Sequence, residues 1–202
     1  MTRVPWWGVV SSTAAPMLLI GGWTVAANAQ PGGFDPVAET ISALAAGDAA
    51  DPGLMTWALV GVGGCHVATA LALRPARLAG RAVLATGGAA TVLVALNPLP
   101  SGTTGSLPHV IAATVALTAL ATWPLLGWQH GRHVPVGLRP PVSTGAGVAL
   151  LILLGWFLAE LVAQGDRVDR IERVASAAQA MWPLIVVLTS RNRANRRCDG
   201  HG

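Results

Sequence analysis

The sequence predicts an all-α membrane protein, a polytopic bundle of six transmembrane helices. Hydrophobic residues make up 52% of the 202 residues and charged residues only 11%, whereas soluble domains have about 25% charged residues. The apolar residues gather in six stretches, each long enough at roughly 20 residues to cross a hydrocarbon core of about 30 Å. Nearly all arginines and carboxylates lie in the breaks between them. The predicted spans are about 6–28, 53–73, 80–97, 107–128, 144–163 and 173–190.

We expect one transmembrane domain over 1–190, followed by a basic cytoplasmic tail over 191–202. The first span follows Arg3 and ends near Ala27-Asn28-Ala29, a pattern shared with cleaved signal peptides. Its apolar run is longer than the usual signal core, so we interpret it as a retained helix. Cleavage would not change the orientation of the other spans, because a signal peptide also starts in the cytoplasm.

Several later spans carry ordinary helix signals at their ends. Asp51 and Pro52 match an N-cap and a first-turn proline for the second span. Ser106 is placed to start the fourth span, and Ser143 the fifth. The second and third spans are rich in small residues, which predicts close packing of helices within the bundle. These residues include Gly61, Gly63, Gly64, Gly87 and Gly88.

The longest break, between the first and second spans, is predicted to hold a short amphipathic helix near 36–46. The cap, the first-turn proline and the terminator would be Asp35, Pro36 and Gly47. At spacings of four and three, one apolar face would be formed by Val37, Ile41 and Leu44. We expect this helix to lie on the outer end of the bundle.

Arginines are distributed unequally between the two sides of the predicted bundle. Ten fall on one side: Arg3, Arg74, Arg77, Arg81, Arg132, Arg139, Arg191, Arg193, Arg196 and Arg197. The other side receives Arg167, Arg170 and Arg173, together with most of the carboxylates. The positive-inside rule then places both termini in the cytoplasm, in a multi-pass protein of the cell membrane. Although the pI is near 10.9, the arginines flank spans and form no basic soluble face, so we expect no nucleic-acid partner.

Several short motifs occur in order along the chain. They are the run from Phe34 to Val37, the run from Glu39 to Leu44, Met55 and the run from Gly61 to His66. Later come Leu73-Arg74-Pro75, Asn97-Pro98 followed by His109, and Trp182-Pro183. In this order they resemble a bacterial integral membrane family called domain of unknown function 998, over almost the whole chain. A more distant similarity links the chain to six-span proteins of the damage-regulated autophagy modulator type, through the Ile-Ser motif in the first outer loop. Neither resemblance implies a biochemical activity.

Polar residues within spans are costly and often mark functional sites. The candidate pocket residues are Asp35, Glu39, Ser42, His66, Asn97, His109, Glu160 and Gln179. Each also has a structural interpretation: Asp35 as a helix cap, His66 as a link to a neighbouring helix, Glu160 as a residue that reaches outward or pairs with Arg167 or Arg173. We further interpret Asp166, Asp169 and Glu172 as a solvated rim between the last two spans.

Three functions remain open for such a pocket. The first is binding of a lipid or small amphiphile in an outward-facing polar pocket. The second is lipid hydrolysis by outer carboxylate and histidine side chains, and the third is transport of a small molecule. The sequence contains no paired histidine and carboxylate motif on one helix, no phosphate-binding loop and no nucleophile elbow. We therefore expect no metal and no cofactor, favour binding, and expect membrane lipids as partners.

Overall fold

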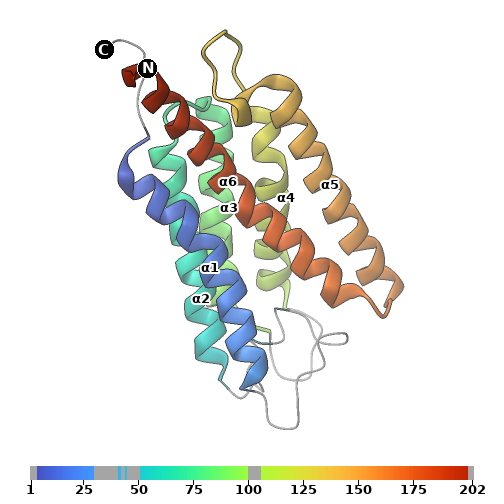
Figure 1. The fold of residues 1–202 in the computed structure, drawn as a ribbon. Helices are drawn as coiled ribbons and strands as arrows, with labels where there is room; N and C mark the ends of the chain where they lie inside the picture. The colour runs from blue at the N-terminus through green and yellow to red at the C-terminus, as the bar shows by residue number, and fades with distance from the viewer. Residues whose placement is uncertain (1–3, 30–40, 42–43, 45–50, 100–105, 200–202) are drawn as a thin grey trace.

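The computed structural model describes residues 4–29, 41, 44, 51–99 and 106–199, with side chains described as far as Asn192. Over these residues the chain forms six helices that are long and apolar enough to cross a membrane (Figure 1). They are α1 (Trp6–Asn28), α2 (Pro52–Ala72), α3 (Leu78–Leu96), α4 (Leu107–Gly127), α5 (Pro140–Ala163) and α6 (Val168–Asp199). One turn of 3-10 helix, η2 (Val136–Leu138), precedes α5. The predicted fold class, a six-span helical bundle, is confirmed.

The six helices form a ring in which each helix packs on the next. The chain passes from α1 to α5 through successive neighbours, and α6 returns to contact both α5 and α1. In Figure 1, α6 crosses the bundle obliquely in front of α3 and α4. Both ends of the chain lie at one end of the bundle, together with the connection between α4 and α5. This arrangement encloses a central space, bordered mainly by α1, α2, α3, α4 and α6.

The start of α2 agrees with the sequence prediction. Asp51 is the N-cap, its Oδ1 accepts a hydrogen bond from Leu54 N at 3.2 Å, and Pro52 takes the first helical position. The starts of α5 and α6 were predicted wrongly. Two prolines without N–H groups begin α5 at Pro140, four residues before the predicted span.

The charged residues that seemed to exclude a span belong to the first turns of α6. This helix begins at Val168 rather than at 173, and Asp169 lies in its first turn, where a carboxylate is favoured by the helix dipole. Ser143, the predicted start of α5, instead lies inside that helix, where its Oγ donates to Pro124 O of α4 at 2.7 Å. The prediction from the positions of charged residues therefore placed the starts of α5 and α6 several residues too late.

The predicted packing of small residues is confirmed where α2 meets α3. A Cβ added to Gly63 would lie 2.5 Å from Gly88 O, and a Cβ added to Gly88 would lie 2.6 Å from Gly63 O. Both distances are too short for any side chain, so only glycine permits this contact between the two backbones. Gly64, the next residue along α2, faces open space instead.

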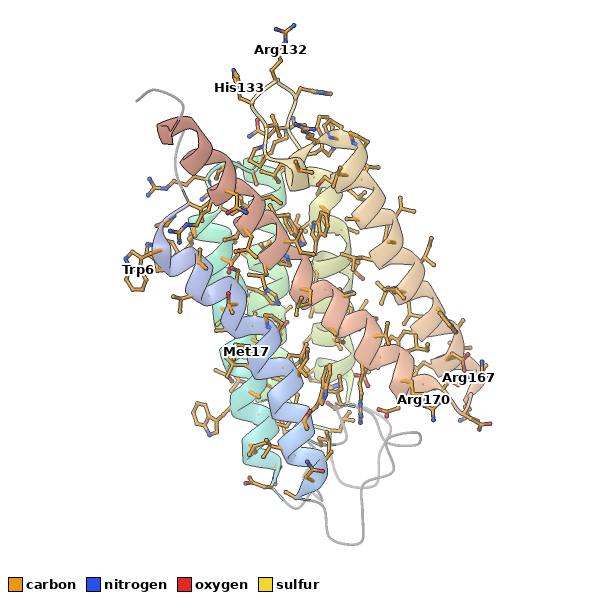
Figure 2. All side chains as sticks on the ribbon, in the orientation of Figure 1. Trp6, Met17, Arg132, His133, Arg167 and Arg170 are labelled. Atoms are coloured by element: carbon orange, nitrogen blue, oxygen red, sulfur yellow. The ribbon has the colours of Figure 1, made fainter. Side chains whose placement is uncertain are left out.

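Charged side chains mark the two ends of the bundle. Arg132 and His133 project at the end that holds the termini, whereas Arg167 and Arg170 project at the opposite end (Figure 2). Apolar side chains such as Trp6 and Met17 are exposed along the side, 71% and 69% respectively. The described charges thus separate to the ends, and the apolar flank is suited to contact lipid.

Which end faces the cytoplasm stays a prediction from the arginine asymmetry. We expect a topology reporter fused after Arg132 or after Gly202 to report the cytoplasm. The same reporter fused after Asp166, in the turn between α5 and α6, should report the opposite side. A cytoplasmic signal from Asp166 together with an external signal from Arg132 would invert the proposed orientation.

Candidate ligand-binding site

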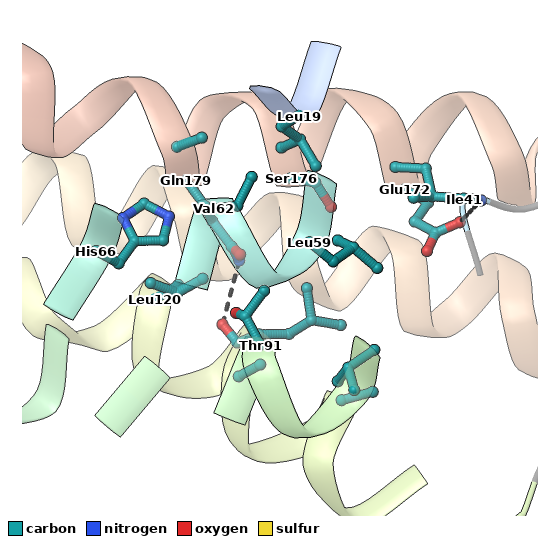
Figure 3. Close-up of a pocket in the computed structure, with 15 residues that line it drawn as sticks. Leu19, Ile41, Leu59, Val62, His66, Thr91, Leu120, Glu172, Ser176 and Gln179 are labelled. Carbon is teal, nitrogen blue, oxygen red and sulfur yellow. Dashed lines mark hydrogen bonds between the residues drawn. The ribbon is translucent and has the colours of Figure 1, made fainter. Parts of the chain in front are cut away.

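A cavity of about 90 Å³ lies between α1, α2, α3, α4 and α6 (Figure 3). Most of its lining is aliphatic and comes from Leu19, Ile41, Leu59, Val62, Val94, Leu117 and Leu120, with alanines at 113, 116 and 180. Five polar side chains complete the lining: His66, Thr91, Glu172, Ser176 and Gln179. An apolar wall with a few converging polar groups is the usual composition of a small-molecule site.

His66 is a fully buried polar group of this cavity. It lies on α2, six residues before the helix ends at Ala72, and only 1% of its surface is exposed. Neither Nδ1 nor Nε2 has a hydrogen-bond partner among the described residues. Leaving a buried polar group unsatisfied costs about 1–3 kcal/mol. The predicted packing bond between His66 and a neighbouring helix is therefore not formed by any described residue.

Gln179 reaches the same cavity from α6, two turns deeper into the bundle than Glu172. Its Nε2 donates to the backbone oxygen of Leu117 on α4 at 3.1 Å, which holds the amide across the space between the helices. Its Oε1 has no partner among the described residues, and the side chain is 1% exposed. Among the described residues, the lining thus includes one acceptor of Gln179 and two nitrogens of His66 that have no hydrogen-bond partner.

Glu172 lies at the opposite end of the cavity from His66, as Figure 3 shows. Its Oε2 accepts a hydrogen bond from Ile41 N at 2.9 Å. Ile41 and Leu44 are 4% and 1% exposed and pack in one cluster with residues that include Met55. Ile41 and Leu44, which were predicted to share an apolar face with Val37, are thus both buried in one cluster. The rest of the predicted helix near 36–46 lies outside the described residues.

The solvated rim predicted for the start of α6 is correct only in part. Asp166 is exposed, but Asp169 is 1% exposed and pairs with Arg173 at 3.3 Å, and Glu172 lines the cavity. The reason is helical spacing. Residues 169, 172, 176 and 179 follow one another by three or four, and 173 follows 169 by four, so they share the face of α6 that looks into the bundle.

Asn97 and His109 meet each other instead of entering the cavity. His109 is 7% exposed, and its Nδ1 lies 2.8 Å from Asn97 O. Because a carbonyl oxygen only accepts, this nitrogen must carry the proton. The contact ties the end of α3 to the start of α4, which gives His109 a structural role.

Glu160 is the third candidate that the structure leaves outside the cavity. It lies near the end of α5, where its Oε1 accepts from Trp156 Nε1 at 3.2 Å. Neither Glu160 nor His109 lines this cavity. Three further candidates, Asp35, Glu39 and Ser42, lie outside the described residues.

Sequence reasoning missed three polar members of the lining: Thr91, Glu172 and Ser176. A usable signal was present for two of them, because Glu172, Ser176 and Gln179 repeat at spacings of four and three along α6. Thr91 carried no such signal, since its hydroxyl bonds Gly87 O of its own helix at 2.9 Å. Within the described parts of the chain, no group of three or more His, Cys, Asp and Glu side chains is placed to hold a metal ion.

Glu172 anchors Ile41, and this contact can be tested by substitution. Glu172→Ala leaves the buried Ile41 N–H without its acceptor, so we expect a loss of about 1–3 kcal/mol of stability. Glu172→Gln keeps an acceptor oxygen and should lose less than half as much. Thermal unfolding in detergent micelles measures both. Equal losses for the two variants would mean that the negative charge, and not the hydrogen bond, holds the contact.

Comparison with known proteins identifies one family. A family model described as "Protein of unknown function (DUF998)" matches residues 13–189, which include all the described cavity residues. Searches among curated proteins and among solved structures gave no match. The predicted resemblance to this family is confirmed, and the similarity to the autophagy modulator type stays a prediction.

Proposed function

Because the chain belongs to the family "Protein of unknown function (DUF998)", whose name assigns no activity, we propose a function from the geometry: the protein binds one end of a lipid or small amphiphile in the cavity between its helices. The observation that supports this proposal is the pair of buried polar side chains, His66 and Gln179. Both line an otherwise apolar cavity, and both keep hydrogen-bonding atoms without a described partner. A ligand with a polar group and an apolar body satisfies both parts of the lining.

The size of the cavity limits how much of a ligand it takes. Pockets for whole drug-sized ligands have about 300–1,000 Å³, whereas this cavity has about 90 Å³. Since a water molecule occupies about 30 Å³ of liquid, the cavity has room for only a few non-hydrogen atoms. We infer that one end of an amphiphile enters and that the rest lies among the helices or in the surrounding lipid.

Binding accounts for the described residues better than hydrolysis or transport. Hydrolysis by a serine needs a base bonded to its hydroxyl, and no hydrogen bond joins Ser176 to His66 among the described contacts. Transport needs access from both sides. Beyond His66, towards the termini, a cluster of fully buried side chains closes the bundle: Leu73, Trp123, Leu138, Val186 and Val187.

Photolabelling with amphiphiles tests the proposal. Three probes share a twelve-carbon chain with a diazirine and differ only in the head group: hydroxyl, carboxylate or ammonium. At least one is expected to label segments of α2 and α6 that line the cavity. Ala113→Leu adds three carbons to the lining and should lower this labelling about tenfold, the equivalent of about 1.4 kcal/mol.

The matched control is Thr114→Leu, one residue further along α4 and exposed on its outer side. The probe should label this variant as strongly as it labels the unmodified protein. If no probe labels the cavity segments, or if Ala113→Leu and Thr114→Leu label alike, the cavity is not a binding site.

A further inference from the structure

We infer that the cavity selects an uncharged, hydroxyl-bearing head group and rejects carboxylate and phosphate head groups. This inference rests on the proposed function and specifies its ligand. It follows from three features of the cavity: its unused hydrogen-bonding atoms, the charged residues around it, and the placement of Glu172 and His66 at opposite ends.

The unused hydrogen-bonding atoms suit a hydroxyl. A neutral imidazole offers one N–H donor and one nitrogen acceptor, and the Gln179 amide offers Oε1 as an acceptor. A hydroxyl is both a donor and an acceptor, so it can donate to Gln179 Oε1 and accept from His66. A carboxylate or phosphate only accepts when ionised, which would leave Gln179 Oε1 without a partner.

The charged residues near the cavity also disfavour an anionic head group. None of the cavity-lining residues is an arginine, and the chain contains no lysine. The acidic residue in the lining is Glu172, and Asp169 precedes it by one helical turn. The nearby cation, Arg173, pairs with Asp169. An anionic head group beside His66 would therefore lack a cationic partner in the lining, which is strongly unfavourable away from water.

An ammonium head group is also disfavoured at the deep end of the cavity. Glu172 could attract it, but Glu172 and Ile41 occupy one end and His66 the other (Figure 3). Gln179 lies between these ends and is held there by its bond to Leu117 O. A cation beside His66 would lie among neutral groups and aliphatic side chains, whereas a hydroxyl there carries no charge to desolvate.

The three photoprobes described above test the inference with the full-length protein in nanodiscs of uncharged lipid. The hydroxyl probe is expected to label the cavity segments at least about tenfold more than the carboxylate probe, with the ammonium probe also weaker. Unlabelled dodecanol should compete with the hydroxyl probe, and dodecanoate should not. Gln179→Met, which keeps the length of the side chain but removes its polar atoms, should reduce this preference to about twofold or less.

The outcomes separate the two proposals. Labelling by the carboxylate probe equal to or above that by the hydroxyl probe, sensitive to Ala113→Leu, would keep the binding function and overturn the selectivity. Stronger labelling by the ammonium probe than by the hydroxyl probe would indicate that the head group binds at Glu172, and would likewise overturn the selectivity. An unchanged preference in Gln179→Met, with Ala113→Leu still blocking, would exclude Gln179 as the acceptor. If no probe labels the cavity, both proposals fail.

Discussion

Replacing His66 by leucine is expected to weaken ligand binding at least about tenfold while leaving the protein at least as stable as before. Leucine is close to histidine in size and leaves no polar atom unsatisfied in the apolar part of the cavity. Removing a buried group that has no described partner should be neutral or should raise the stability by about 1 kcal/mol. Labelling of the cavity by the hydroxyl probe should fall by at least about tenfold, which corresponds to about 1.4 kcal/mol of binding free energy.

The other buried histidine supplies the control for this experiment. His109 is nearly as well buried as His66, at 7% against 1% exposure, but its Nδ1 is bonded to Asn97 O. His109→Leu should therefore lower stability by about 1 kcal/mol and leave labelling of the cavity unchanged. Thermal unfolding and photolabelling on the same samples measure both properties. If His66→Leu destabilises the protein and still binds the probe, His66 serves packing alone.

Replacing Gly88 by alanine is expected to cause a large loss of stability for a change of one methyl group. The new Cβ would meet Gly63 O at 2.6 Å, His66 Cβ at 2.9 Å and Val67 N at 3.0 Å. Two of these three atoms belong to the backbone of α2 and cannot rotate away, so the helices must separate. Such overpacking costs about 1–3 kcal/mol. Because His66 Cβ is one of the atoms displaced, labelling of the cavity should also decrease.

Gly64→Ala is the matched control for Gly88→Ala. It makes the same chemical change on α2 at a position with nothing within 4 Å of the added Cβ. Since alanine is the better helix former, Gly64→Ala should be neutral or slightly stabilising. Midpoints of thermal unfolding in micelles compare the two variants. Equal midpoints would show that α2 and α3 move apart without loss, and that the glycine contact is not required.

The class of the fold could be predicted from the sequence because the membrane imposes it. Six stretches of about 20 apolar residues each must satisfy their backbone hydrogen bonds internally in lipid, and helices do this within one segment. Local chemistry also fixed details such as the Asp51 cap. The same reasoning failed at the start of α6, because charged residues were assigned to solvent without asking which side of a helix they occupy.

The candidate site shows more clearly what could not be predicted from the sequence. Of the predicted residues, His66 and Gln179 line the cavity. The side chain of Asn97 bonds its own helix at Leu93 O, His109 bonds the backbone oxygen of Asn97, and Glu160 lies near the end of α5. All of these have the same property in the sequence, a polar side chain in an apolar stretch. What separates them is the direction in which each side chain points, and that depends on helix rotation and on which helices are neighbours.

The sequence by itself therefore determined the number of spans, the α-helical class, the family and the small residues at which helices approach. Only the tertiary structure decided that α6 closes the ring against α1, that Glu172 and Ser176 turn inward, and that His66 faces a cavity without a described partner. The physical reason lies in the range of the interactions. The length of an apolar stretch and the cap of a helix depend on residues within one segment of the chain. The cavity is formed by five helices, whose contacts join residues far apart in the chain.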